Sequence, residues 1–258
     1  MLGVTGPADD FTAPQRRKIR IEIAVVLAVT FGLSAYTALL RLTEAVILGL
    51  SGQTVALNPR RSPIDLIDLG LNLATVFQLL AWGTLGLYLL WRSGFGPASI
   101  GLGRFQLRPD LLGGLGLAAL IGLPGLGLYL VGRLVGIGVS VEPAELNDTW
   151  WRVPVLLAVA FANGWAEEII VVAFLMTRLR QLRLTPVTVL VASSVVRGLY
   201  HLYQGFGAGL GNIVMGLVFG YVWQRTGRLW PLIIAHGVID AVAFVGYALM
   251  AGRLGWLP

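Results

Sequence analysis

The chain has 258 residues, of which 56% are hydrophobic and only 12% are charged. A soluble domain carries roughly 25% charged residues, so this composition excludes an ordinary soluble fold and indicates a membrane protein. The formal net charge is +6, but the basic residues are spread over many loops, so we expect no nucleic-acid partner. There is no cysteine, which excludes disulfides, thiol nucleophiles and thiolate metal sites.

Seven apolar segments follow one another, and each is long enough to cross an apolar layer of about 30 Å as a helix. They lie at 22–50, 65–92, 110–134, 151–182, 185–204, 208–226 and 229–251. The fourth is long enough to be broken in two, so eight helices remain an alternative. We therefore predict an all-α protein, a polytopic membrane helix bundle. Residues 1–15 are expected to form a disordered tail, and 16–258 a single transmembrane domain.

The basic residues predict the orientation of the bundle. With the N-terminus inside, twelve of the nineteen Lys and Arg residues flank the cytoplasmic ends of the segments: Arg16, Arg17, Lys18, Arg20, Arg92, Arg104, Arg108, Arg178, Arg180, Arg183, Arg225 and Arg228. Six fall on the opposite side: Arg41, Arg60, Arg61, Arg133, Arg152 and Arg253. This bias predicts a multi-pass protein of the plasma membrane with a cytoplasmic N-terminus and a C-terminus on the opposite side.

Two adjacent carboxylates interrupt the fourth segment, where the sequence reads NGWAEEIIVVAFLM. Each ionised group at bilayer depth costs at least about 2.5–3.5 kcal/mol on insertion scales, so Glu167 and Glu168 require partners, water or a function. Adjacent helical positions diverge by about 100°, so the two carboxylates face different directions. Asn163 lies one turn before Glu167 and shares its face.

The other rare polar groups lie in two later segments. In the fifth, Ser194, Arg197 and His201 form one stripe at positions i, i+3 and i+7. In the seventh, Asp240 follows His236 by one turn and can orient its imidazole. Taken singly, each group has a structural interpretation, such as a hydrogen bond across helices or an ion pair. Taken together, they are expected to converge inside the bundle, because lipid offers them no partners.

These motifs resemble those of the CPBP intramembrane proteases, a family that includes type II CAAX prenyl endopeptidases and bacteriocin-processing or immunity proteins. The matching stretches are EEIIVVAFL at Glu167–Leu175, RGLYH at Arg197–His201 and HGVID at His236–Asp240. The resemblance covers about residues 150–250, which would be the protease-like core of the domain.

Two positions depart from the pattern of the family. The first motif usually reads Glu-Glu-x-x-x-Arg, but Val172 stands at the position of the arginine. The second usually reads Phe-x-x-x-His, but Arg197 stands at the position of the phenylalanine. We infer that the cation has moved from one helix to the next, where Arg197 can still neutralise Glu168.

The resemblance implies a mechanism for the site. Glu167 would be the general base on a water that attacks the scissile carbonyl, and His201 would help to position that water. His236, held by Asp240, would donate to the oxyanion, with Asn163, Glu168 and Arg197 in support. We prefer a site without a metal or other cofactor. The alternative is zinc on Glu167, His201 and His236, which would need three or four ligands at about 2.0–2.2 Å.

The sequence therefore predicts an intramembrane endopeptidase of the CAAX protease type, classed as metalloprotease-like. Its partners would be the lipid bilayer and a substrate that is a membrane protein or a lipidated, including prenylated, peptide. The first alternative is a non-catalytic membrane scaffold or immunity factor of the same fold. The second is a small-molecule transporter, against which the lack of a visible internal repeat weighs. The oligomeric state stays open.

Overall fold

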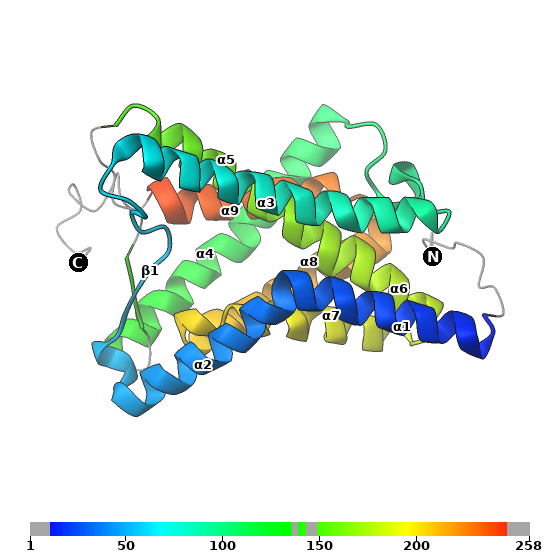
Figure 1. Ribbon diagram of the computed structural model, residues 1–258, viewed down its shortest axis with the longest axis horizontal. Coiled ribbons are helices and arrows are strands. Elements are labelled where there is room, and N and C mark those ends of the chain that lie inside the picture. The colour runs from blue at the N-terminus through cyan, green and yellow to red at the C-terminus, as the bar shows by residue number, and fades with distance from the viewer. Residues whose placement is uncertain (1–10, 136–138, 143–148, 247–258) are drawn as a thin grey trace.

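The computed structural model describes residues 11–135, 139–142 and 149–246. In these residues the chain forms seven helical segments, four of which contain a π-helical turn (Figure 1). Their parts are α1 Ala13–Leu27, η1 Ala28–Gly32 and α2 Leu33–Leu48; α3 Asp65–Arg92; η4 Leu107–Leu112 and α4 Gly113–Leu134; α5 Arg152–Glu167, η5 Glu168–Phe174 and α6 Leu175–Gln181; α7 Pro186–Tyr200; α8 Phe206–Thr226; and α9 Trp230–Ala241 with η7 Val242–Gly246. Short 3-10 turns lie at η2 Leu50–Gly52, η3 Pro97–Ile100 and η6 Leu202–Gln204.

The all-α membrane bundle predicted from the sequence is confirmed, and each predicted segment corresponds to one observed segment. Five segments are long and apolar enough to cross a membrane, and the described parts of the other two, 186–200 and 230–246, are shorter apolar helices. The fourth segment is continuous, which favours seven helices over eight. Helix α1 begins inside the tail expected at 1–15, of which residues 1–10 lie outside the described part, as does the end of the segment expected at 229–251.

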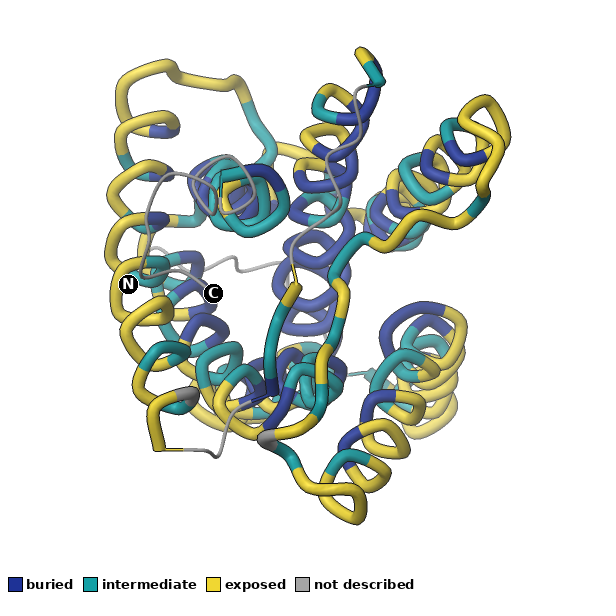
Figure 2. Tube along the Cα trace, turned by 90° about the vertical axis from the view of Figure 1, so that its left-hand side faces the viewer, coloured by how far each residue is buried: buried dark blue, intermediate teal, exposed yellow. Residues whose placement is uncertain are grey.

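The helix formed by α5, η5 and α6 is the centre of the bundle. In an apolar stretch of 18 residues within this helix, 72% of the residues are buried. In the corresponding stretches of the other four long segments, only 11–33% are buried. Figure 2 looks along the bundle and shows this buried helix surrounded by helices whose outward sides are exposed. A membrane helix that carries ionisable groups must be covered by protein, because lipid offers those groups no partners, whereas the outer helices can present apolar residues to lipid. The first motif therefore lies on the best-covered helix.

The π-helical turn η5 begins at Glu168, within the first motif. A π turn shifts the backbone hydrogen bonds from i+4 to i+5 and rotates the residues that follow, and such turns are frequent at functional sites. Ser193 of α7 donates from Oγ to the carbonyl oxygen of Val171 in this turn, at 2.7 Å. The irregular part of the central helix is thus tied to the helix that carries the second motif.

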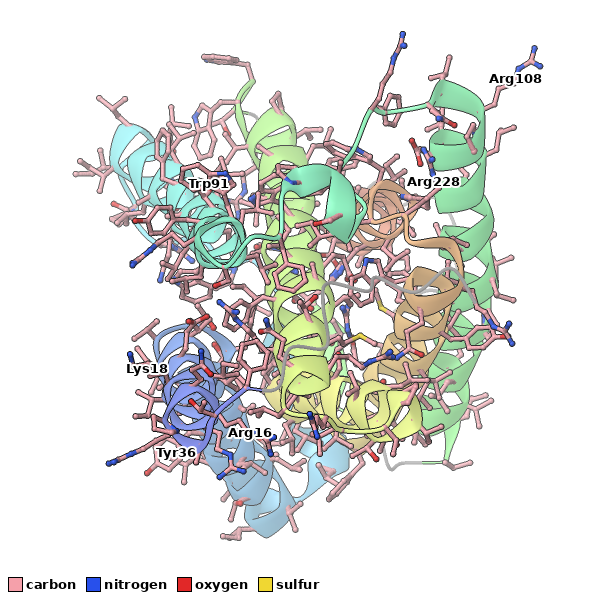
Figure 3. All side chains as sticks on the ribbon, turned by 90° about the vertical axis from the view of Figure 1, so that its right-hand side faces the viewer. Arg16, Lys18, Tyr36, Trp91, Arg108 and Arg228 are labelled. Carbon is pink, nitrogen blue, oxygen red and sulfur yellow. The ribbon has the colours of Figure 1, made fainter. Side chains whose placement is uncertain are left out.

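Different structural elements lie at the two ends of the bundle. At one end, Arg228 makes two hydrogen bonds to the buried carboxylate of Asp110, at 2.7 and 2.8 Å. Figure 3 faces this end and shows Arg16, Lys18, Arg108 and Arg228 around it. At the other end, strand β1 (Thr54–Ala56) pairs in parallel with β2 (Ser140–Glu142).

Near that second end Arg152 and Asp68 form an ion pair at 3.2 Å, with the two side chains 1% and 0% exposed. The sequence analysis counts Arg152 among the basic residues on the side opposite the cytoplasm, where a flanking residue would be exposed. It is instead a buried link between α3 and α5. We call the end with Arg228 the basic end and the end with β1 and β2 the strand end.

Candidate active site

Seven of the eight polar residues predicted to converge do meet in the interior of the bundle; the eighth, Ser194, donates instead to the carbonyl oxygen of Leu190 in its own helix. Helix α5 carries Asn163 and Glu167, and η5 begins with Glu168. Arg197 lies in the last turn of α7, and His201 caps the C-terminal end of that helix. His236 and Asp240 are one turn apart in α9. A continuous set of contacts shorter than or equal to 4.0 Å joins all seven side chains.

Glu168, Arg197 and His236 form the most deeply buried part of the cluster. Glu168 and Arg197 are both 0% exposed, and Nη2 of Arg197 lies 2.7 Å from Oε1 of Glu168. The same oxygen lies 2.7 Å from Nδ1 of His236, so that nitrogen donates to the carboxylate. The predicted contact between Arg197 and Glu168 is therefore present. Arg197 also lies over the ring of Phe219, 5.7 Å from its centroid, which adds a cation–π contact.

Glu167 occupies the next position on the helix and faces a different set of partners. Its Oε2 accepts a hydrogen bond of 2.6 Å from the hydroxyl of Tyr200 and lies 3.6 Å from Nη1 of Arg197. Its Oε1 accepts from the amide of Asn163 at 3.1 Å. Nε2 of His201 lies 4.0 Å from that Oε1, beyond direct hydrogen-bond range. The carboxylate is thus held from one side and faces an imidazole across a gap on the other.

His201 is oriented by the backbone of its own helix. Its Nδ1 lies 3.0 Å from the carbonyl oxygen of Arg197. A carbonyl oxygen only accepts, so Nδ1 carries the proton and the neutral ring presents Nε2 as an acceptor toward Glu167. The side chain is 14% exposed, whereas that of Glu167 is 3% exposed. His201 therefore lies between the buried carboxylate and the more accessible part of the site.

The expected pairing of Asp240 with His236 differs in the structure. Oδ2 of Asp240 lies 3.6 Å from Nε2 of His236, which is too far for a hydrogen bond, and it accepts instead from Asn163 at 2.8 Å. The close partner of His236 is Glu168, on the other ring nitrogen. The physical reason is the packing of α5 on α9. A Cβ on Gly164 would lie 3.0 Å from the carbonyl oxygen of Ile233 and 3.2 Å from Cβ of His236, so the bare backbone lets the two helices approach closely.

Tyr200 is a site residue that the sequence analysis missed. It is 5% exposed, stacks on Phe31 with ring centroids 4.7 Å apart, and makes the shortest hydrogen bond to Glu167. The residue lies inside the RGLYH stretch, three positions after Arg197, and that spacing would have placed it on the polar face of the helix. Tyrosine is common in membrane proteins, however, and its type alone did not mark it.

The cluster does not fit a resident metal ion. Within the described residues no group of three or more His, Asp or Glu side chains is arranged to hold one. The oxygens of Glu167 are already engaged by Tyr200 and Asn163. A fixed guanidinium, that of Arg197, lies 3.3 Å from the His236 ring, and a divalent cation beside it would be repelled. We therefore derive no chemical step through a metal.

The fold and the site together define a class of protein: an all-α membrane bundle with a buried cluster of carboxylates, histidines and one arginine. Comparison with known proteins agrees: residues 149–242 match the family described as type II CAAX prenyl endopeptidase Rce1-like. The match supports the resemblance of the motif-bearing part of the chain to the CPBP family and, in general terms, an intramembrane protease of the CAAX type. No curated protein and no solved structure matched the chain.

Proposed function

We propose that the protein is an intramembrane endopeptidase that hydrolyses a peptide bond of a membrane-associated substrate with a water activated by Glu167. The gap of 4.0 Å between Oε1 of Glu167 and Nε2 of His201 carries this proposal. Both atoms are acceptors in the arrangement described above, and a water fits between them as a donor to both. Its two hydrogens would then be occupied, and its lone pairs would be free to attack the carbonyl carbon of the substrate.

The reaction follows from these positions. Glu167 takes a proton from the water as its oxygen bonds to the carbonyl carbon, which gives a tetrahedral intermediate with a negatively charged oxygen. The protonated Glu167 then gives the proton to the leaving nitrogen, and the C–N bond breaks. Tyr200 and Arg197 keep the carboxylate in place throughout, at 2.6 and 3.6 Å from Oε2.

His236 is the proposed donor to the oxyanion, through Nε2; because Nδ1 already donates to Glu168, this role requires the doubly protonated, cationic ring. Its Nε2 points to the side of the site where Glu167 and Asp240 lie, at 3.9 and 3.6 Å. The carboxylate of Glu168 holds the opposite ring nitrogen at 2.7 Å and fixes the plane of the ring. A donor that is fixed before the reaction stabilises developing charge without the cost of reorientation. In this proposal Asp240 acts through Asn163 as well as through His236.

The remaining expectations are parts of the same proposal. The protein would lie in the plasma membrane with a cytoplasmic N-terminus and act without a metal or other cofactor. Its substrate would be a membrane protein or a lipidated peptide. Purified protein with about one zinc per chain that is lost in His201→Ala or His236→Ala would contradict the metal-free mechanism.

The decisive experiment compares Glu167→Gln with Glu44→Gln. Gln has the shape of Glu but cannot take the proton, so Glu167→Gln should accumulate normally and lose at least about 10²-fold in activity. Glu44 is an exposed partner of Arg41, and its variant controls for the general effect of removing a carboxylate. The readout is the set of new protein termini in membranes of cells that carry each variant. Unchanged termini in Glu167→Gln would favour a non-catalytic scaffold of the same fold.

A further inference from the structure

The basic end and the strand end differ in how they cover the site. On the basic side of Glu167, every residue from Ala166 to Arg178 of the central helix is buried. The loop at 97–106 is pinned over this end, because the indole N–H groups of Trp223 and Trp230 donate to the carbonyl oxygens of Ile100 and Gly103, each at 3.0 Å. The backbone N–H of Leu229 donates to Gly101 at 3.0 Å. Protein atoms therefore fill the space between the site and the basic end.

The opposite side of the site is less covered. The partly exposed members of the cluster are Asn163, His201 and Asp240, the last two with side chains 14% and 16% exposed. The residues that follow His201 and Asp240 in the chain, 202–204 and 241–244, are at least partly exposed as well. A pocket of about 390 Å³ lies here, lined by Ser34, Thr37, Ala38 and Arg41 of α2 and by Tyr200 and Tyr203. Tyr200 connects this pocket to the site, because its hydroxyl donates to Glu167.

The position of His201 along α7 also places the site nearer to one end of the bundle than to the other. Helix α7 begins at Pro186, next to Arg183 at the basic end, and its 15 residues rise about 22 Å before His201. The apolar layer of a membrane is about 30 Å thick. The chain turns back toward the basic end at Phe206, where α8 starts. His201 therefore lies nearer to the strand end than to the basic end.

The basic residues assign these ends to the two sides of the membrane. In Figure 1 the start of α1, the ends of α3 and α6, and the starts of α7 and α9 gather at the basic end. Four of the basic residues around it are labelled in Figure 3. Short cytoplasmic loops carry an excess of Lys and Arg, so the basic end faces the cytoplasm.

We propose that the active site opens away from the cytoplasm, through the pocket between α2 and η6, and that its substrates are extracytoplasmic segments of membrane-anchored or exported polypeptides. The identity of the pocket as a substrate entrance rests on the proposed protease function. The direction of the opening rests on the burial and charge described above. A cytosolic prenylated C-terminus would arrive at the sealed side and is therefore not the substrate in this proposal.

The absence of cysteine makes the direction directly measurable. Ser34→Cys places one thiol in the lining of the pocket, and Gln204→Cys places one beside Tyr203 of that lining, at the partly exposed edge of the opening. Ser99→Cys places one in the exposed loop of the basic end. Intact cells and inverted membrane vesicles are treated with a maleimide that does not cross membranes. We expect Gln204→Cys and Ser34→Cys to be labelled in intact cells and Ser99→Cys only in inverted vesicles. The wild-type chain, which cannot be labelled, is the background control.

Labelling of Gln204→Cys and Ser34→Cys from the cytoplasmic side, or from neither side, would overturn the proposal. Labelling of Ser99→Cys in intact cells would overturn the assignment of the basic end. A labelling result is used only if the variant accumulates in the membrane. If either Gln204→Cys or Ser34→Cys fails to fold, the other variant alone tests the opening. The measurement needs no catalysis. If the opening is extracytoplasmic but Glu167→Gln changes no protein terminus, the protease function fails while the direction stands.

Discussion

Arg152 and Arg197 are both buried in the bundle, but their surroundings differ. Arg152 donates to Asp68 at 3.2 Å and to the carbonyl oxygen of Asn58 at 2.8 Å, while the other oxygen of Asp68 accepts from the backbone N–H of Arg61 at 2.8 Å. In the Arg197 cluster, Nε of Arg197 and Oε2 of Glu168 have no hydrogen-bond partner among the described residues. Buried polar atoms without partners are rare where a group serves only stability. Arg152 and Asp68 therefore form a structural ion pair, whereas the Arg197 cluster contains buried donor and acceptor atoms without a partner among the described residues.

The largest effect is expected for Arg197→Leu. The substitution leaves Glu168 buried, with His236 as its remaining close partner, and the loss of one member of a buried ion pair costs about 3–5 kcal/mol in the free energy of unfolding. Activity should be lost with it. The measurement is accumulation in membranes and thermal unfolding in detergent, with Arg41→Leu as the exposed control. If Arg197→Leu is as stable as Arg41→Leu, Arg197 does not neutralise Glu168.

Removal of both members of each pair sharpens the comparison. The double variants Asp68→Leu with Arg152→Leu and Glu168→Leu with Arg197→Leu leave no unpaired charge, so each should accumulate better than the corresponding single arginine variant. Only the second pair contacts His236, so only the second double variant is expected to lose proteolysis. Equal activity in the two double variants would mean that Arg197 and Glu168 are a structural pair like Asp68 and Arg152.

An intermediate effect is expected for Tyr200→Phe. The lost hydrogen bond to a charged carboxylate is worth about 1.5–3 kcal/mol, so kcat/KM should fall roughly 10- to 100-fold while the chain still folds. Tyr221→Phe is the control, because Tyr221 is exposed on α8 and lines neither the site nor the pocket beside α2. Equal losses in both variants would mean that the hydroxyl of Tyr200 does not act through its hydrogen bond to Glu167.

The convergence of the site could be predicted from the sequence because lipid leaves polar groups few choices. Glu168 and Arg197 are both fully buried, and each is the charge that can compensate the other. The helical spacing of Asn163 and Glu167 likewise predicts the hydrogen bond that is observed between them. The fold class follows from the length of the apolar segments in the same way.

The spacing of residues along one helix does not predict the contacts between helices, which depend on tertiary packing. Asp240 is one turn from His236, as periodicity requires, but the close packing of α5 and α9 brings Glu168 nearer to the ring. The contact of Tyr200 with Glu167 also joins two helices, and no pattern along either helix contains it. The parallel pairing of β1 with β2 depends on two short segments that are far apart in the chain, and neither has the length that would mark a strand.

The smallest effect is expected for Ser193→Ala, which tests whether the π turn at the first motif depends on its link to α7. The substitution removes the 2.7 Å hydrogen bond to the carbonyl oxygen of Val171, three residues after Glu168. The free energy of unfolding should fall by about 0.5–1.5 kcal/mol, and activity should fall a few-fold, because the turn sets the direction of Glu168. Ser194→Ala is the matched control, since Ser194 Oγ donates to Leu190 within its own helix and links no second element. Thermal unfolding in detergent and the rate of terminus formation would be compared for the two variants. Indistinguishable variants would mean that the π turn is fixed by the packing of its apolar side chains and not by the serine.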